Sequence, residues 1–195
     1  MKLYAQTEEE VLYPAAILVG EYLKSRDRRL MAGKIYHYLA GDHARLDLLL
    51  AEAASDPKTI DPAAYAEFRA GLLRHIALEE KILLPAAQRL RDGKALPIAA
   101  KLRLDHGALA ALLVPTPTAS IVAAIRSVLE AHNPLEEGPA GLYEECERLA
   151  GAEADPIVEA LRNAPEVRVA PHNDGPGVIE ATRRALAKAG YSFEL

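Results

Sequence analysis

Histidines and acidic residues recur in this sequence in two patterns that could bind metal ions. An Asp-His pair occurs at Asp42–His43 and again at Asp105–His106. Each pair is followed further along the chain by a His-x-x-x-Glu-Glu motif, at His75–Glu80 and at His132–Glu137. Residues four apart lie one turn apart on the same helical face, so the histidine and first glutamate of each motif can reach one ion. Imidazole suits iron, zinc, copper and nickel, and the pattern therefore predicts a metal site.

Two carboxylates that each bridge two ions, together with four imidazoles, would make six protein ligands around a two-metal centre. Such a centre would keep positions open for a bridging oxygen and a small ligand. Burying these groups together without a metal would be costly. We therefore expect six side chains to converge on one interior pocket: His43, His75, Glu79, His106, His132 and Glu136.

Three further acids are candidates for orienting an imidazole from behind or for serving as alternative ligands. Asp47 lies four residues after His43, and Glu80 and Glu137 each follow a predicted ligand directly. Pro134 interrupts the second motif and can disturb its spacing, since proline removes a helical hydrogen bond. Glu137 therefore competes with Glu136 for the ligand position.

Other histidines and aspartates near these motifs are not expected to bind metal. Asp42 and Asp105 are interpreted as surface groups or as partners that orient an imidazole. His37 lies about 120° around the helix from His43, and His172 falls in a predicted loop.

Four long segments with apolar periodicity are expected to position the ligands. Asp61-Pro62 predicts a helix start, Gly93 a stop, Pro97 a restart, and Gly138-Pro139 an interruption, with another near Pro134. We expect the second helix to end or bend soon after Pro85, so that His75 and His106 lie at the same height. Short connections favour an all-α, up-down-up-down four-helix bundle. The segments are about 29–55, 62–90, 97–113 and 119–150.

The sequence divides into three predicted parts. Residues 1–28 form an N-terminal helical appendage, with a helix at 7–26, and residues 29–152 form the bundle. Residues 153–195 form a C-terminal extension ending in a short helix, at 178–189, which Gly190 stops. Residues 7–26 and residues 166–195 are each expected to pack against the bundle or to serve a contact in a homodimer.

At these motifs the chain resembles the hemerythrin-like, HHE cation-binding family over about residues 34–150. The resemblance is carried by Asp-His-x-x-Leu-Asp from Asp42, by His-x3-Glu-Glu-x2-Leu-x-Pro from His75, by the second Asp-His, and by His-Asn-x2-Glu-Glu with Leu142-Tyr143 downstream. It implies an up-down four-helix bundle holding two non-haem iron ions, with an oxo or hydroxo bridge, on the six residues above. Zinc and manganese are the alternative metals.

One departure from that family bears on function. Oxygen-carrying hemerythrins have His-x3-His on the third helix, whereas Ala110 stands four residues after His106. One ion would then have one imidazole fewer and a more open site. This favours sensing, or peroxide or nitric oxide chemistry, over reversible oxygen carriage.

Composition narrows the partners and the location. The net charge is −5 and the pI about 5.7, which argues against nucleic acid, because its phosphates attract clustered Lys and Arg. The apolar stretch 11–20 is too short to span a membrane, and the single cysteine, Cys146, excludes an intrachain disulfide. We expect a soluble, cytoplasmic protein.

These observations leave three hypotheses of function. The leading one is a non-enzymatic di-iron module that binds or senses oxygen, nitric oxide or redox state, its ligand being a small diatomic molecule or peroxide. The second is an enzyme that reduces peroxide or nitric oxide, or oxidises iron. The third is a metal store or a structural metal protein.

Overall fold

The computed structural model describes residues 33–56 and 58–193. The chain divides into two compact units, Met1–Gly33 and Lys34–Leu195, and apart from Gly33 the described residues all belong to the second unit. The predicted helix at 7–26, and residues 29–32 of the first predicted bundle segment, lie outside the described residues.

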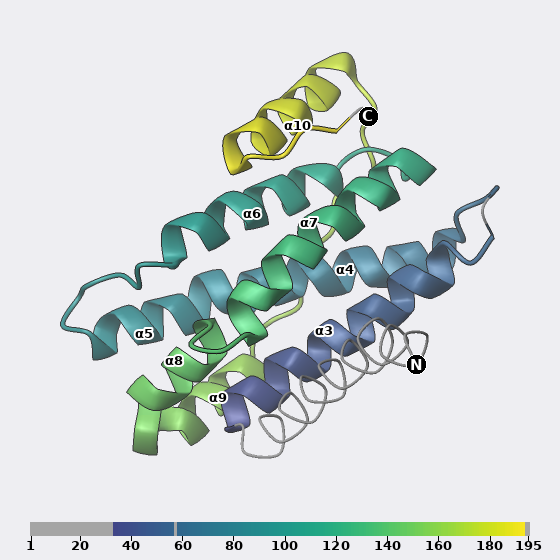
Figure 1. The fold of residues 1–195 in the computed structure, drawn as a ribbon. Helices are drawn as coiled ribbons and strands as arrows, with labels where there is room; N and C mark the ends of the chain where they lie inside the picture. The colour runs from purple at the N-terminus through teal and green to yellow at the C-terminus, as the bar shows by residue number, and fades with distance from the viewer. Residues whose placement is uncertain (1–32, 57, 194–195) are drawn as a thin grey trace, which may run out of the picture. The chain divides into compact units, whose positions relative to one another are not determined.

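The described part of the chain is all-helical, as the sequence predicted (Figure 1). It contains no β-strand, and one isolated bridge joins Asp56 and Thr59. The elements are α3 (Lys34–Ala53), α4 (Pro62–Leu78), the π-helical segment η2 (Glu79–Leu83), α5 (Leu84–Leu90), α6 (Ala99–Leu112), α7 (Ala119–Glu137), α8 (Leu142–Ala150), the 3₁₀ turn η3 (Gly151–Glu153), α9 (Ala154–Arg162) and α10 (Pro176–Ala189).

Local signals fix most helix ends. The Asp61 carboxylate caps α4 by accepting hydrogen bonds from the amides of Ala63 and Ala64, which otherwise would lack partners in the first turn. The Thr118 hydroxyl caps α7 in the same way. Gly190 ends α10 with φ at 92°, a left-handed conformation that costs glycine little. The predicted stop at Gly93 is also confirmed, since α5 ends at Leu90.

The predictions about the two prolines have different outcomes. The second helix ends at Leu90, the predicted bound of its segment, and η2 lies between α4 and α5; the alternative of a bend after Pro85 stays a prediction. Pro85 lies in the first turn of α5, directly after the wider π turn, where a missing amide hydrogen is tolerated. The interruption predicted near Pro134 is wrong, because Pro134 lies inside α7, in the last turn. The break comes only at residues 138–141.

The helices that carry the predicted ligands pack against one another. Helix α3 contacts α4, α6 contacts α7, and α3 also contacts α7. Their shared core includes the fully buried side chains of Phe68, Leu112 and Ile125. Each buried side chain of this size contributes about 1.5–3 kcal/mol relative to an exposed one. This core holds the facing sides of the helices at fixed positions.

The remaining helices cover this group on its flanks. Helix α8 packs against α3 and α7, and α9 packs against α3. Helix α10 lies along α6 (Figure 1), where the Thr182 hydroxyl donates a 3.1 Å hydrogen bond to the Ala111 carbonyl and Leu186 is buried. None of the helices in residues 33–193 is both long and apolar enough to cross a membrane.

Candidate metal centre

The structure brings the six predicted ligand side chains together. All six are at least 95% buried, and both carboxylates are fully buried. They come from five elements, with Glu79 supplied by the π-helical segment η2. The six are His43 on α3, His75 on α4, Glu79 on η2, His106 on α6, and His132 and Glu136 on α7.

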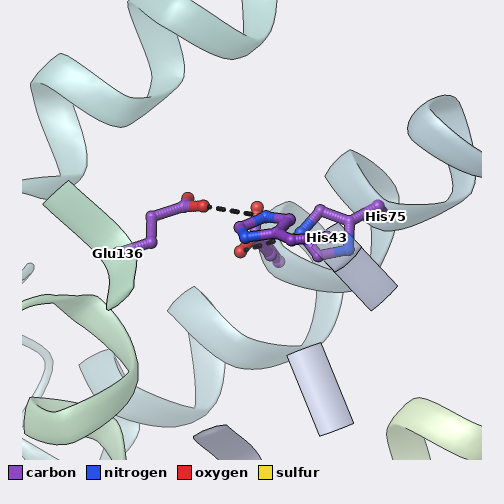
Figure 2. A group of neighbouring side chains, drawn as sticks. His43, His75 and Glu136 are labelled. Atoms are coloured by element: carbon purple, nitrogen blue, oxygen red, sulfur yellow. Dashed lines mark ion pairs between the residues drawn. The ribbon is translucent and has the colours of Figure 1, made fainter. Parts of the chain in front are cut away.

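These side chains form two groups that share both carboxylates. One group contains His43 and His75, the other contains His106 and His132, and Glu79 and Glu136 belong to each. Within a group, one candidate ligand atom from every residue lies within 4.8 Å of all the others. Figure 2 shows Glu136 reaching toward the adjacent imidazoles of His43 and His75.

Each shared carboxylate divides its two oxygens between the groups. Glu79 Oε1 lies 3.5 Å from His75 Nε2, while Oε2 lies 3.1 Å from His106 Nε2. Glu136 Oε2 lies 3.4 Å from His43 Nε2, while Oε1 lies 3.1 Å from His132 Nε2. This is the arrangement in which two carboxylates can bridge a pair of cations.

Every imidazole also has a carboxylate partner on its outer side. These partners hold Nδ1 as a donor, so that Nε2 presents its lone pair to the centre, as in the carboxylate–histidine–metal arrangement. The pairs and their distances are His75 with Asp42 at 2.9 Å, His106 with Glu80 at 2.8 Å, His43 with Glu137 at 2.5 Å, and His132 with Asp105 at 3.4 Å.

The outer pairs account for the whole repeated motif. The aspartate of each Asp-His pair orients the histidine of the motif that follows it. The second glutamate of each His-x-x-x-Glu-Glu motif orients the histidine of the other Asp-His pair. Asp47 differs from the other candidates: among the described residues it has no hydrogen bond to an imidazole, and it lines a depression beside Asn133 and Pro134. His37 and His172 are exposed and lie outside the cluster.

Backbone geometry explains which glutamate points inward. Helix α7 keeps its i, i+4 spacing through Pro134, and His132 Nε2 lies 3.1 Å from Glu136 Oε1. Glu136 is therefore the inner residue, while Glu137, with 30% of its side chain exposed, is the outer one. In the first motif, Glu79 opens the π segment, an irregularity often found at functional sites.

The donor set fits a cation, because it has buried atoms without hydrogen bonds and an excess of negative charge that no described Lys or Arg side chain neutralises at its centre. Glu79 Oε2, Glu136 Oε1 and His106 Nε2 are buried and lie close to other polar atoms of the centre, yet none of the three makes a hydrogen bond to a described residue. A buried atom of this kind costs about 1–3 kcal/mol. The two inner carboxylates, Glu79 and Glu136, repel each other. The four carboxylates that pair with the outer sides of the imidazoles add further negative charge around them. Arg45, Lys101 and Arg103 pair with three of those outer acids, but none of them reaches the inner two.

The electrostatics of the metal-free site point the same way. Burial lowers the pKa of His75, yet the Glu79 carboxylate and the hydrogen bond to Asp42 outweigh it and raise this pKa to about 10. Burial also lowers the pKa of His106, but the Glu136 and Glu79 carboxylates outweigh burial and raise this pKa to about 11. The site thus holds positive charge strongly, as protons or as metal ions.

Comparison with protein families agrees with this chemistry. Residues 1–87 match the family model of the Hemerythrin HHE cation binding domain. The resemblance predicted from the motifs is thereby confirmed, over a range that begins and ends earlier than the predicted 34–150. The hemerythrin HHE match includes His43, His75 and Glu79 and ends before His106. No curated protein and no solved structure gives a match.

One residue of this site was missed by the sequence reasoning. The Tyr143 hydroxyl is fully buried and donates a 2.8 Å hydrogen bond to Glu79 Oε1. Burial and the charges of Glu136 and Glu79 raise the pKa of Tyr143 well above 10. The sequence marked Tyr143 only as part of the family resemblance. Its position depends on the chain reversal between α7 and α8, which no periodicity encodes.

Proposed function

We propose that this protein is a non-haem di-iron protein that binds or senses a small ligand: oxygen, nitric oxide or a change of redox state. The observation that carries the proposal is the pair of buried two-histidine groups that share Glu79 and Glu136. The proposed fold is an up-down-up-down hemerythrin-like bundle, and the family match supports it.

The donor set favours iron over the alternatives. Structural zinc sites are usually closed tetrahedra rich in cysteine. Cys146, the single cysteine of the sequence, belongs to neither group of candidate ligands. Imidazoles combined with carboxylates are typical of non-haem iron centres with open positions. Bound iron would supply reversible electron transfer and a site for a small ligand, while the protein supplies orientation and exclusion of water.

A catalytic role is the second candidate, favoured by Ala110. Its methyl side chain stands one turn after His106, where a further imidazole would close the site. An enzyme would consume hydrogen peroxide or nitric oxide continuously, whereas a sensor or carrier would bind such a ligand without turnover. Steady-state consumption by the iron-loaded protein separates the two.

The experiment that tests shared bridging is the substitution Glu79→Gln. Glu79 contributes one oxygen to each group, so its loss should lower iron from about two ions per chain to well below one. Glu67→Gln is the matched control, because Glu67 is exposed on the neighbouring helix α4. Retention of two ions by Glu79→Gln would overturn the shared-bridge arrangement.

A further inference from the structure

The two halves of the centre differ in one side chain, Tyr143. Its Oη lies 2.8 Å from Glu79 Oε1 and 3.2 Å from Glu136 Oε2. It also lies 3.2 Å from His43 Nε2 and 3.3 Å from His75 Nε2. A single hydroxyl oxygen therefore touches one ligand atom from every residue of this group.

Four acceptors surround one proton at this oxygen. A phenol has one hydrogen to donate, and the 2.8 Å bond to Glu79 uses it. The His43 and His75 imidazoles direct Nδ1–H outward to carboxylates. In the neutral form that metal binding requires, each therefore presents a lone pair at Nε2. Three of the four contacts thus bring lone pairs together, and a cation placed among them would turn that repulsion into attraction.

The distances also match those between neighbouring ligands of one ion. Two donor atoms at about 2.1 Å from a metal, at right angles to each other, lie about 3.0 Å apart. The four Oη distances, from 2.8 to 3.3 Å, bracket this value. An atom at this distance from all four others has the spacing expected of a further ligand of the same ion.

The other half has no counterpart to this hydroxyl among the described residues. Glu79 Oε2, Glu136 Oε1 and His106 Nε2 are buried there and lack any hydrogen-bond partner. The residue one turn after His106 is Ala110, which has no donor atom in its side chain. The described part of the chain therefore leaves three buried polar atoms on that side for an added group to satisfy.

We propose that Tyr143 is a phenolate ligand of the metal ion held by His43 and His75. The two metal positions are then chemically unequal, and a small exogenous ligand binds on the His106 and His132 side. When the ion binds, an oxygen–metal bond forms and the phenol proton leaves to solvent, with no change of oxidation state. This inference rests on the di-iron function proposed above.

The test is vibrational spectroscopy of the ferric protein. Phenolate bound to ferric iron gives a charge-transfer band in the visible, and resonance Raman excitation in that band selects the phenolate ring vibrations. In the wild-type protein these vibrations should be present, and they should shift when the protein is produced with ring-deuterated tyrosine. Tyr143→Phe should lose them completely.

Tyr65→Phe is the matched control. Tyr65 is equally buried, and its hydroxyl has no hydrogen-bond partner among the described residues, yet it belongs to neither ligand group; this variant should keep the band. If Tyr143→Phe binds less iron, the isotope shift in the wild-type protein still shows whether a tyrosine phenolate is bound to the iron. Two irons per chain without any phenolate vibration would overturn the ligand role alone, whereas a chain without bound iron would overturn the di-iron function itself.

Discussion

At the scale of single residues, the centre is organised by carboxylates that touch imidazoles rather than metal. Asp42 accepts from His75 Nδ1 at 2.9 Å and also pairs with Arg45. It therefore fixes both the orientation of the ring and the nitrogen that carries the proton. Substitution of a residue that orients a metal ligand in this way typically lowers metal affinity or activity.

Asp42→Asn should weaken metal binding by about 10–100-fold, because an amide no longer accepts a charge-assisted hydrogen bond from His75. Competition with a chromophoric chelator measures the affinity. Asp47→Asn is the control on the same helix, since the structure gives Asp47 no hydrogen bond to a described imidazole, and it should leave affinity within about twofold. Equal losses in both variants would show that charge in this region, not orientation, determines binding.

The titration of the metal-free site gives a second prediction at this scale. Folding raises the pKa of His75 to about 10 and that of His106 to about 11, from about 6.5 in the unfolded chain. Their contribution to stability is complete below pH 6.5 and is lost as pH rises toward 10–11. The pKa of Glu79 in the folded protein is lowered well below 4.5. Its contribution to stability is therefore present above pH 4.5 and is lost as the pH falls through this lowered pKa.

Thermal unfolding in the presence of a chelator should therefore give a higher Tm at pH 6 than at pH 9. Metal loading should reverse the trend, because protons and metal ions compete for the same nitrogens. A chelated protein whose Tm is the same or higher at pH 9 would show that these histidines are not held in the charged form by Glu79 and Glu136.

At the scale of elements, the turn between α7 and α8 places both Glu136 and Tyr143. A β-carbon at Gly141 would lie 2.6 Å from the Glu136 carbonyl oxygen and 2.9 Å from the carbonyl oxygens of Gly138 and Leu135. These neighbours are backbone atoms, which cannot move aside without shifting the turn.

Gly141→Ala should therefore destabilise the protein by about 1–3 kcal/mol, the usual cost of forcing extra volume into a packed site. Chemical denaturation measures the change. The control is Gly41→Ala, in the exposed middle of α3 with open space around a new β-carbon, which should stabilise by about 0.5–1 kcal/mol. A neutral Gly141→Ala would mean that the turn can shift freely.

Elements also show where prediction from sequence succeeds and where it fails. Asp61, Gly93 and Gly190 were identified because caps and left-handed stops act within a few residues. The ligands were identified because the i, i+4 spacing fixes a shared helical face. The π segment before Pro85 and the contact of Tyr143 were not, because both depend on packing between elements far apart in the sequence.

At the scale of the whole described unit, the C-terminal helix is connected to the centre. Lys101 Nζ donates to Asp105, the partner of His132, at 2.6 Å and to the Ala189 carbonyl at the end of α10 at 3.1 Å. Leu186 fixes α10 on α6 with 1% of its surface exposed. The position of α10 thus bears on one of the outer carboxylates.

Leu186→Ala should lower the free energy of unfolding by about 2–5 kcal/mol, as expected for a truncated core leucine. Denaturant titration checks this value. Leu48, with 72% of its surface exposed, provides the control, and Leu48→Ala should change stability by less than about 0.5 kcal/mol. Equal, small effects would show that α10 is not docked against α6 through Leu186.

The proposed function depends most on two metal ions sharing Glu79 and Glu136 between two pairs of buried imidazoles. Metal analysis of protein purified without added metal tests this arrangement most directly. We predict about two iron ions per chain, lost together in Glu79→Gln and retained in Glu67→Gln. One zinc ion per chain, or no bound metal, would contradict it.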